Sequence, residues 1–236
     1  MTRRRWIADQ VSGSRALLVG PHAEHLSRVL RARIGQEFDI STGNEVRRGV
    51  IASISSDRVE FELGETVPTS TALQVTLALS IFKFDRMEWA IEKCTELGAA
   101  RIVPVIAHRS EAHLAAASLK RAERWRRIAH EAAEQSRQVS PPEISAPMKL
   151  NDVIALPAST RIVLSEAEEQ ITLKEALQSH TSGEIILALG PEGGWTGAEL
   201  EMFRNAGWAS ASLGNAILRA ETAAIAAMAI VVAELQ

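Results

Sequence analysis

The sequence predicts a mixed α/β fold in which a small β-barrel precedes a larger domain built on a parallel sheet. Short strand-like segments separated by Gly, Asn, Ser and Asp turns fill the first 70 residues. From about residue 72 onward, apolar strand-like runs alternate with segments of helical period. Residues 64–71, with Pro68 and several Thr or Ser residues, have the composition of a linker. We therefore expect domains at residues 1–70 and 72–236.

The composition favours a globular protein with no membrane role. The chain has 236 residues, of which 46% are hydrophobic, and this is ample for a packed core. The first residues lack the basic, apolar and small-residue pattern of a signal peptide. The most apolar segment, residues 223–233, is shorter than the roughly 20 residues that span a bilayer. We expect a cytoplasmic protein.

The cysteine and histidine content argues against a metal site. Cys94 is the single cysteine, which excludes an intrachain disulfide and a cysteine-cluster metal site. The six histidines include no H-E-x-x-H pair. Cys94 lies on the apolar side of an expected helix, where a buried structural thiol is favoured over a catalytic one. We predict no metal.

The first domain carries an excess of positive charge within an acidic chain. Residues 1–33 contain seven arginines against two acidic residues, although the whole chain has a net charge of −3. A helix expected at 22–33 places Leu26, Val29 and Leu30 on one face and its arginines largely elsewhere. Such a surface can bind RNA phosphates, and a solvated basic face is the alternative. The expected strands of this domain are 16–19, 37–41, 46–54 and 58–63.

The second domain shows the strand and helix alternation of a parallel α/β sheet. A helix whose apolar positions recur from Met87 to Leu97 ends at Gly98, which can cap it. A long helix is expected at 119–139, with Trp125 on its buried side. The expected strands are 74–81, 101–106, 161–164 and 185–189.

A glycine-rich turn follows the last of these strands. Residues 185–189 are all apolar, as in a buried strand, and residues 190–194 read Gly-Pro-Glu-Gly-Gly. Thr196 and Glu199 have the spacing of a capping box, so a helix is expected to begin there. Glycines between strand and helix let backbone groups approach a ligand closely.

A second strand, glycine turn and helix occupy residues 210–236, with the turn at Gly214. Together the two turns offer backbone donors and acceptors, with apolar walls, that suit a flat heterocycle. Ordinary tight turns are the alternative. The G-x-x-x-x-G-K-[ST] and G-x-G-x-x-G fingerprints are absent, which disfavours phosphate-loop enzymes and nucleotide-dependent oxidoreductases.

The motifs GPEGGW and LGNAILRAETA closely resemble the RsmE family of ribosomal RNA methyltransferases, of the SPOUT class. Further matches are H-x-x-x-V-L-R from His25, KFDR from Lys83 and EAAEQSR from Glu131. The resemblance implies an N-terminal PUA-like RNA-binding β-barrel and a C-terminal SPOUT α/β domain with a deep trefoil knot. It also implies a C2 homodimer that uses S-adenosylmethionine to methylate uracil N3 in 16S rRNA, as free RNA or in the small ribosomal subunit.

Two other functions stay open at this point. One is ribose 2'-O methylation of RNA by an enzyme of the same class. The other is a catalytically silent RNA-binding protein of ribosome assembly. Analysis of the product nucleoside distinguishes methylation of the ribose from methylation of the base. RNA binding without S-adenosylmethionine binding would favour the silent RNA-binding protein.

The resemblance also suggests roles for individual residues. Arg219 is expected to stabilise the uracil anion, while Glu221 or Glu134 accepts its proton or orients Arg219. The chain departs from the family at Ala216, where a basic residue is expected, and has Trp195-Thr196 where Phe-Ser is common. The expected cofactor contacts are Leu164, Ser165, Leu189, Gly190, Gly194, Leu213, Gly214 and Leu218. The expected RNA contacts are Arg3, Arg4, Arg28, Arg31, Lys83, Arg109 and Arg137.

Overall fold

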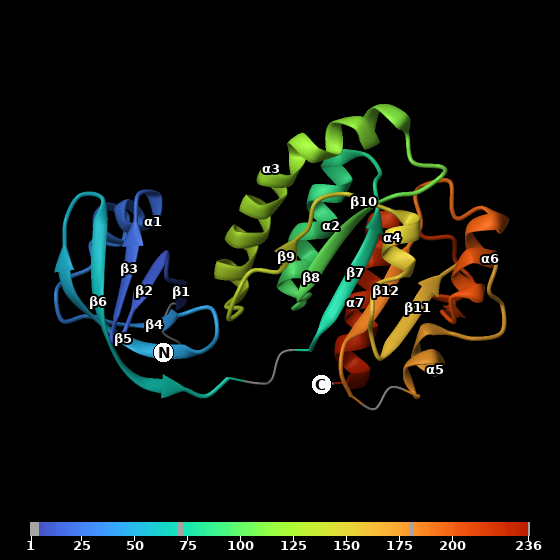
Figure 1. The fold of residues 1–236 in the computed structure, drawn as a ribbon. Helices are drawn as coiled ribbons and strands as arrows, with labels where there is room; N and C mark the ends of the chain where they lie inside the picture. Colours follow the sequence, from blue (N-terminus) through green and yellow to red (C-terminus); the bar gives the residue numbers. More distant parts are fainter. Residues whose placement is uncertain (1–4, 70–72, 180–181, 236) are drawn as a thin grey trace. The chain divides into compact units, whose positions relative to one another are not determined.

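The computed structural model describes residues 5–69, 73–179 and 182–235, which form two compact units (Figure 1). The N-terminal unit comprises Met1–Thr71 with Ala133–Pro141, and the C-terminal unit comprises Ala72–Ala132 with Pro142–Gln236. The end of the long expected helix therefore groups with the N-terminal unit. Arg3 and Arg4, two of the expected RNA contacts, lie outside the described residues.

The N-terminal unit is a curled six-stranded sheet in the order β1-β4-β5-β6-β3-β2. Alternate side chains point inward and build a core that includes Leu18, Ile40 and Phe61. The four strands expected from sequence are all present, and two short N-terminal strands add to them. The strands are β1 (Arg5–Ile7), β2 (Gln10–Ser12), β3 (Arg15–Val19), β4 (Glu37–Ser41), β5 (Val46–Ile54) and β6 (Arg58–Val67).

The prediction of one helix at 22–33 is wrong in the type and length of helix. The chain makes a short helix α1 (Pro21–Glu24) and then a π-helical turn (His25–Val29), closed by a hydrogen bond of 3.0 Å from Leu30 N to His25 O. The wider π turn shifts the phase of the side chains, so Leu26 is buried while Val29 is 66% exposed.

The C-terminal unit contains a parallel sheet in the order β10-β8-β7-β12-β11-β13, with β9 paired to β8. Strand β12 lies between β7 and β11, so the chain crosses over before it returns to the middle of the sheet (Figure 1). The strands are β7 (Val75–Ser80), β8 (Arg101–Ile106), β9 (Glu143–Ile144), β10 (Met148–Lys149), β11 (Thr160–Leu164), β12 (Ile185–Leu189) and β13 (Ala209–Ala211).

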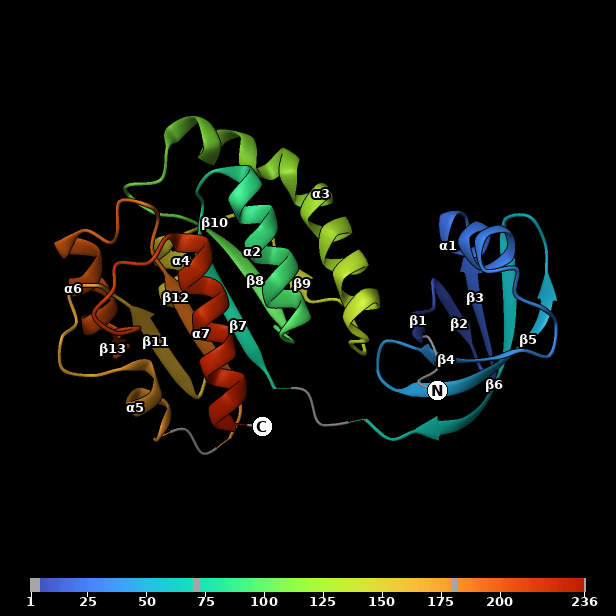
Figure 2. The ribbon, with the colours of Figure 1, turned by 180° about the vertical axis from the view of Figure 1, so that it is seen from behind.

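Helices cover both faces of this sheet, which explains why its central strands are apolar throughout. In β12, Leu187 packs into the core formed with α2, α3, α5 and α7, whereas Ile186 and Ala188 pack into the core formed with α4 and α6. Figure 2 shows α2 and α7 side by side on the first face. The helices are α2 (Phe84–Glu96), α3 (Ala112–Ser136), α4 (Leu150–Ile154), α5 (Leu173–Leu177), α6 (Gly197–Asn205) and α7 (Ala220–Leu235).

The long helix α3 starts seven residues before the expected residue 119, because residues 112–118 are rich in alanine and continue the helix. It ends before Arg137, whose φ of 61° is left-handed and cannot extend an α-helix. Among the described residues, no helix combines the length and apolar character needed to cross a membrane.

The capping box at the start of α6 is present as predicted. The Thr196 side chain accepts from Glu199 N at 3.2 Å, and Glu199 Oε2 accepts from Thr196 N at 2.8 Å. We expect Thr196→Ala to lower the free energy of unfolding by about 1 kcal/mol, because a helix-terminal amide loses its acceptor. Thermal unfolding followed by circular dichroism measures this. Thr172→Ala, which removes the same box from α5, is the matched comparison, and an unchanged melting temperature in both would contradict the expectation.

Cys94 is fully buried in α2, in agreement with the structural thiol expected from sequence. Burial raises the pKa of the Cys94 thiol to about 12, because the charged thiolate is poorly solvated there. At pH 8 we expect the folded protein to react with a disulfide reagent roughly 1,000-fold more slowly than the denatured chain, since the thiolate is the nucleophile. Stopped-flow absorbance measures both rates, and similar rates would show that Cys94 is accessible.

Candidate functional site

Three loops meet at one edge of the parallel sheet. They are the first loop (165–167), the second loop (190–194) and the third loop (212–219), which follow β11, β12 and β13. The strands are in register at their ends, where Leu164 pairs with both Leu189 and Ala211. Because parallel strands end at a common edge, their loops converge there. They enclose a cavity of about 350 Å³, the size of a small-molecule site.

All eight residues expected to contact the cofactor line this cavity. The resemblance suggested these eight residues, and each lies at the end of a strand or in the loop that follows it. Arg219, the expected charge-stabilising residue, also lines it. The lining members of the expected set are Leu164, Ser165, Leu189, Gly190, Gly194, Leu213, Gly214 and Leu218.

Two glycines of the lining are required by geometry. Gly194 has a left-handed φ of 69°, and a Cβ at this position would lie 2.5 Å from Glu166 Oε1. Gly214 has a φ of 106°, which residues with side chains rarely adopt. A side chain at either position would strain the backbone, so both turns require glycine.

Trp195, which directly follows the second loop, contacts the end of β11. Its indole Nε1 donates to the carbonyl of Leu164 at 3.0 Å, and its ring packs edge-on against Phe203 at 5.0 Å between centroids. Phenylalanine, the residue expected here from the family pattern, cannot make this hydrogen bond. Tryptophan at this position therefore keeps an aromatic ring and adds a hydrogen bond that phenylalanine would lack.

The loop after β8 contacts the second loop and α6 from outside the cavity lining. Arg109 Nη1 donates to Gly193 O at 2.5 Å, and His108 N donates to Glu199 Oε1 at 2.7 Å. Arg109 is exposed, as an RNA contact would need, but its guanidinium already holds the backbone of the second loop. The contact between Arg109 and Gly193 was not predicted from the sequence.

A charged cluster at the cavity was likewise not predicted from the sequence. Arg86 lines the cavity from the first turn of α2, and its Nη1 donates to Glu192 Oε1 at 2.7 Å. Its Nε lies 3.7 Å from Glu221 Oε1. Glu221 is 4% exposed and is not among the lining residues, so its carboxylate lies beside Arg86 and not at the cavity surface. The KFDR motif drew attention to this position but gave no sign of these partners.

Arg219 differs from Arg86 in having no such partners. Its side chain is exposed, and its guanidinium makes no hydrogen bond or ion pair with the residues that the structure describes. It shares the third loop with Ala216 and with Ile217, which is 88% exposed. Arg219 is thus a cation available to a ligand at the cavity.

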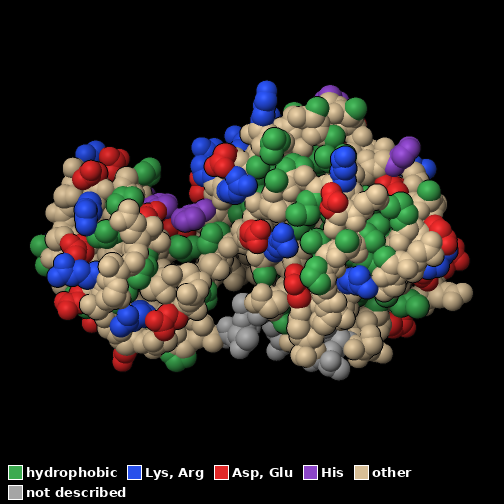
Figure 3. Space-filling view, viewed as in Figure 1, with side chains coloured by type: hydrophobic (Ala, Val, Ile, Leu, Met, Phe, Trp, Pro, Cys, Tyr) green, Lys and Arg blue, Asp and Glu red, His purple; other side chains and the backbone are tan. Residues whose placement is uncertain are grey.

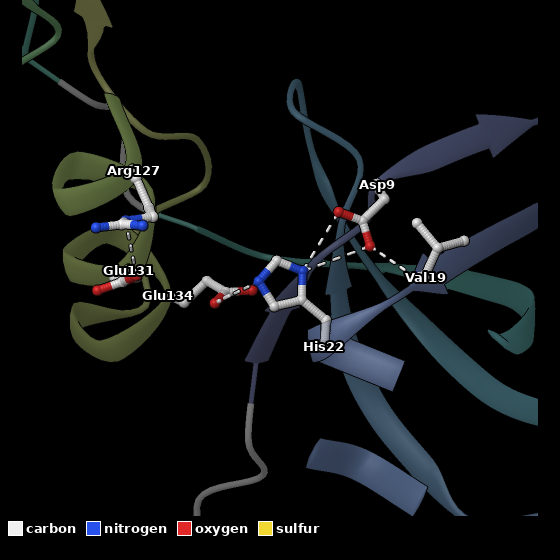
Figure 4. Close-up of polar contacts among 6 residues, drawn as sticks. All are labelled: Asp9, Val19, His22, Arg127, Glu131 and Glu134. Atoms are coloured by element: carbon white, nitrogen blue, oxygen red, sulfur yellow. Dashed lines mark hydrogen bonds and ion pairs between the residues drawn. The ribbon is translucent and has the colours of Figure 1, made fainter. Parts of the chain in front are cut away.

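Glu134 lies in the N-terminal unit and not in the lining of the cavity. There His22 stands between two carboxylates, with Nδ1 3.3 Å from Asp9 Oδ1 and Nε2 3.6 Å from Glu134 Oε2 (Figure 4). Asp9 Oδ2 also accepts from Val19 N at 2.8 Å. The structure therefore gives Glu134 a contact with His22 within its own unit.

The expected RNA contacts are surface residues wherever the structure describes them. Arg28 is in the π-helical turn, Arg31 follows that turn with a φ of 51°, and Lys83 immediately precedes α2. Arg137 accepts a hydrogen bond from Arg5 through its carbonyl, which leaves its own guanidinium outside that contact. On the face shown in Figure 3, basic and acidic side chains are interspersed in both units.

Comparison with known proteins places the chain among RNA methyltransferases. Residues 69–232 match the model of an RNA methyltransferase domain. The chain is 32% identical over 226 residues to ribosomal RNA small subunit methyltransferase E of Synechocystis, covering 94% of this chain and 74% of that relative. It is 31% identical over 230 residues to the protein of the same name from Aquifex aeolicus, covering 94% and 96%.

Solved structures agree over nearly the whole chain. A ribosomal RNA small subunit methyltransferase E from Neisseria gonorrhoeae, bound to S-adenosylmethionine, is 29% identical with a TM-score of 0.82, covering 97% of this chain and 96% of its own. A methyltransferase from Legionella pneumophila, also with S-adenosylmethionine, is 25% identical with a TM-score of 0.83, covering 99% and 98%.

Proposed function

The chain belongs to the ribosomal RNA small subunit methyltransferase E family, and from this premise we propose that it methylates N3 of a specific uridine in 16S rRNA. It is an S-adenosylmethionine-dependent methyltransferase of small-subunit ribosomal RNA, as its relatives are. The single observation that carries the proposal for this chain is the convergence of all eight expected cofactor residues on one cavity.

The cavity has the chemistry that S-adenosylmethionine requires. Leu164, Leu189, Leu213 and Leu218 supply apolar surface for a flat base, and Gly190 and Gly214 bring backbone groups into the lining. A Cβ at Gly194 would lie 2.5 Å from Glu166 Oε1, another residue of the lining, so this turn requires glycine. We assign these residues to cofactor binding.

Arg219 is assigned the role of stabilising charge on the base. When bound, the cofactor supplies an electrophilic methyl group on a sulfonium. The uracil imide must lose its proton for N3 to attack, and the resulting anion is stabilised by a nearby cation. Arg219 is suited to this because its side chain is exposed, lines the cavity and carries a guanidinium. The target uridine must also leave its stack so that N3 can enter the cavity.

The resemblance extends the proposal to architecture. We propose that the N-terminal unit is a PUA-like barrel: β1 and β2 stand at opposite ends of its sheet order and are joined by only Ala8 and Asp9, which favours closure. The crossover that puts β12 between β7 and β11 is compatible with a trefoil knot. The domains proposed are 1–70 for RNA binding and 72–236 for catalysis.

RNA contacts and self-association complete the proposal. Arg28, Arg31, Lys83, Arg109 and Arg137 are exposed cations that can contact phosphate. A C2 homodimer is proposed, and exposed Ile217 is an apolar group that such an interface could cover. Sedimentation equilibrium tests the dimer directly.

The experiment is methylation of defined substrates. Small ribosomal subunits lacking their modifications, and protein-free 16S rRNA, are incubated with labelled S-adenosylmethionine, and the labelled nucleoside is identified after digestion. We expect N3-methyluridine at one position. A 2'-O-methylated nucleoside would replace the proposal with ribose methylation, and RNA binding without any label would favour a silent assembly protein.

A further inference from the structure

Of the two arginines in the cavity lining, Arg86 is the one to which the proposed reaction gives no role. It stands in the first turn of α2, with 31% of its side chain exposed. It faces carboxylates from two separate segments: Glu192 in the second loop and Glu221 in the first turn of α7. We call these three residues the Arg86 cluster.

Glu221 depends on Arg86 for compensation of its charge. It is 4% exposed, and its Oε2 is buried without a hydrogen-bond partner among the described residues. A buried carboxylate is costly unless a cation or hydrogen bonds replace its lost hydration. Arg86, 3.7 Å away, is the ion-pair partner that the structure gives Glu221. The start of α7, which directly follows the third loop, therefore relies on the position of Arg86.

Glu192 links the same arginine to the second loop. The pair is partly exposed, with 32% of the Glu192 side chain accessible, so it stabilises the fold little by itself. The pair instead constrains geometry, because a planar guanidinium that contacts two carboxylates limits how far apart they can lie. The second loop and the first turn of α7 are thereby tied through one side chain.

We propose that Arg86 is a positioning residue that ties the second loop to the first turn of α7 and so sets the width of the cofactor cavity. Its link to cofactor affinity rests on the function proposed above. In this role Glu221 is the counter-charge of Arg86 and not the proton acceptor of the reaction, since its carboxylate is not part of the cavity lining. Two carboxylates already neutralise Arg86, so it is not an anion-binding group.

Amide hydrogen exchange of the free protein tests the tie without any cofactor. In Arg86→Met we expect at least roughly tenfold faster exchange for the amide of Gly194, bonded to Pro191 O, and for that of Ala223, bonded to Arg219 O. Glu192→Gln, a partly exposed change, should accelerate Gly194 and leave Ala223 unchanged. Wild-type exchange of both amides in Arg86→Met would overturn the proposal.

A double variant separates positioning from simple burial of charge. Arg86→Met with Glu221→Gln removes both the cation and the buried anion. We expect Gly194 exchange to stay fast, because the tie is still missing. Recovery of wild-type exchange would overturn the proposal, since uncompensated Glu221 would then explain the whole effect.

Calorimetry with S-adenosylmethionine tests the consequence for the cavity. Arg86→Met should raise the Kd at least roughly tenfold. Arg124→Met removes a comparable Arg–Glu pair, which joins Arg124 to Glu88 at 2.7 Å, and should leave the Kd unchanged. An unchanged Kd in Arg86→Met would overturn the link to cavity width. A wild-type protein that neither binds the cofactor nor methylates would instead overturn the proposed function, and the exchange result would still decide the tie.

Discussion

Replacing Arg219 with alanine should lower the rate of methyl transfer roughly 100- to 1,000-fold while leaving S-adenosylmethionine binding nearly unchanged. The guanidinium is exposed at the cavity and unengaged by the residues that the structure describes, so its removal takes away a charge without disturbing packing. Single-turnover kinetics at saturating RNA measure the transfer step, and calorimetry measures the cofactor Kd.

Two further variants test whether the loss of rate comes from the charge of Arg219. Arg219→Lys keeps the charge and should recover part of the rate, whereas Arg204→Ala removes an exposed arginine paired with Glu201 on α6 and should change neither quantity. Wild-type turnover of Arg219→Ala at saturating RNA would exclude the role. A parallel loss of cofactor affinity would make Arg219 a cofactor contact instead.

Gly194→Ala should weaken S-adenosylmethionine binding roughly 10- to 100-fold, because a left-handed φ costs about 1–3 kcal/mol for a residue with a side chain. The new methyl group would also meet Glu166 Oε1 at 2.5 Å and push that carboxylate away from its place in the lining. Calorimetry on the purified variant measures the Kd, and circular dichroism confirms that the fold is retained.

Gly197→Ala is the matched control. It lies three residues further along at the first position of α6, and a Cβ there meets nothing within 4 Å. The double change Gly194→Ala with Glu166→Ala removes the contact but not the backbone strain, so it divides the loss between the two causes. Binding by Gly194→Ala as tight as by the wild type would show that the second loop adapts freely.

The site was predictable where its signals are local. Gly190, Gly194 and Gly214 stand at turns between a strand and a helix, and the Thr196–Glu199 capping box needs only its spacing along the chain. The resemblance to a known family assigned a cofactor to these turns. The helix expected at 22–33 was wrong in form because a π turn depends on how Leu26 fits into the core, which periodicity does not record.

Alternation, helical period and capping are set by neighbours along the chain, and these signals predicted the strands of five or more residues and the glycine turns beside the cavity. The resemblance to a known family assigned the cofactor residues. Which distant side chains meet at the cavity depends instead on long-range packing. Trp195 reaches the carbonyl of Leu164, and Arg86 reaches Glu192, because β12 lies beside β11 and α2 packs against α7. Those arrangements follow from burial of apolar faces across the whole unit, and such long-range packing leaves no spacing in the sequence from which the partners could be predicted.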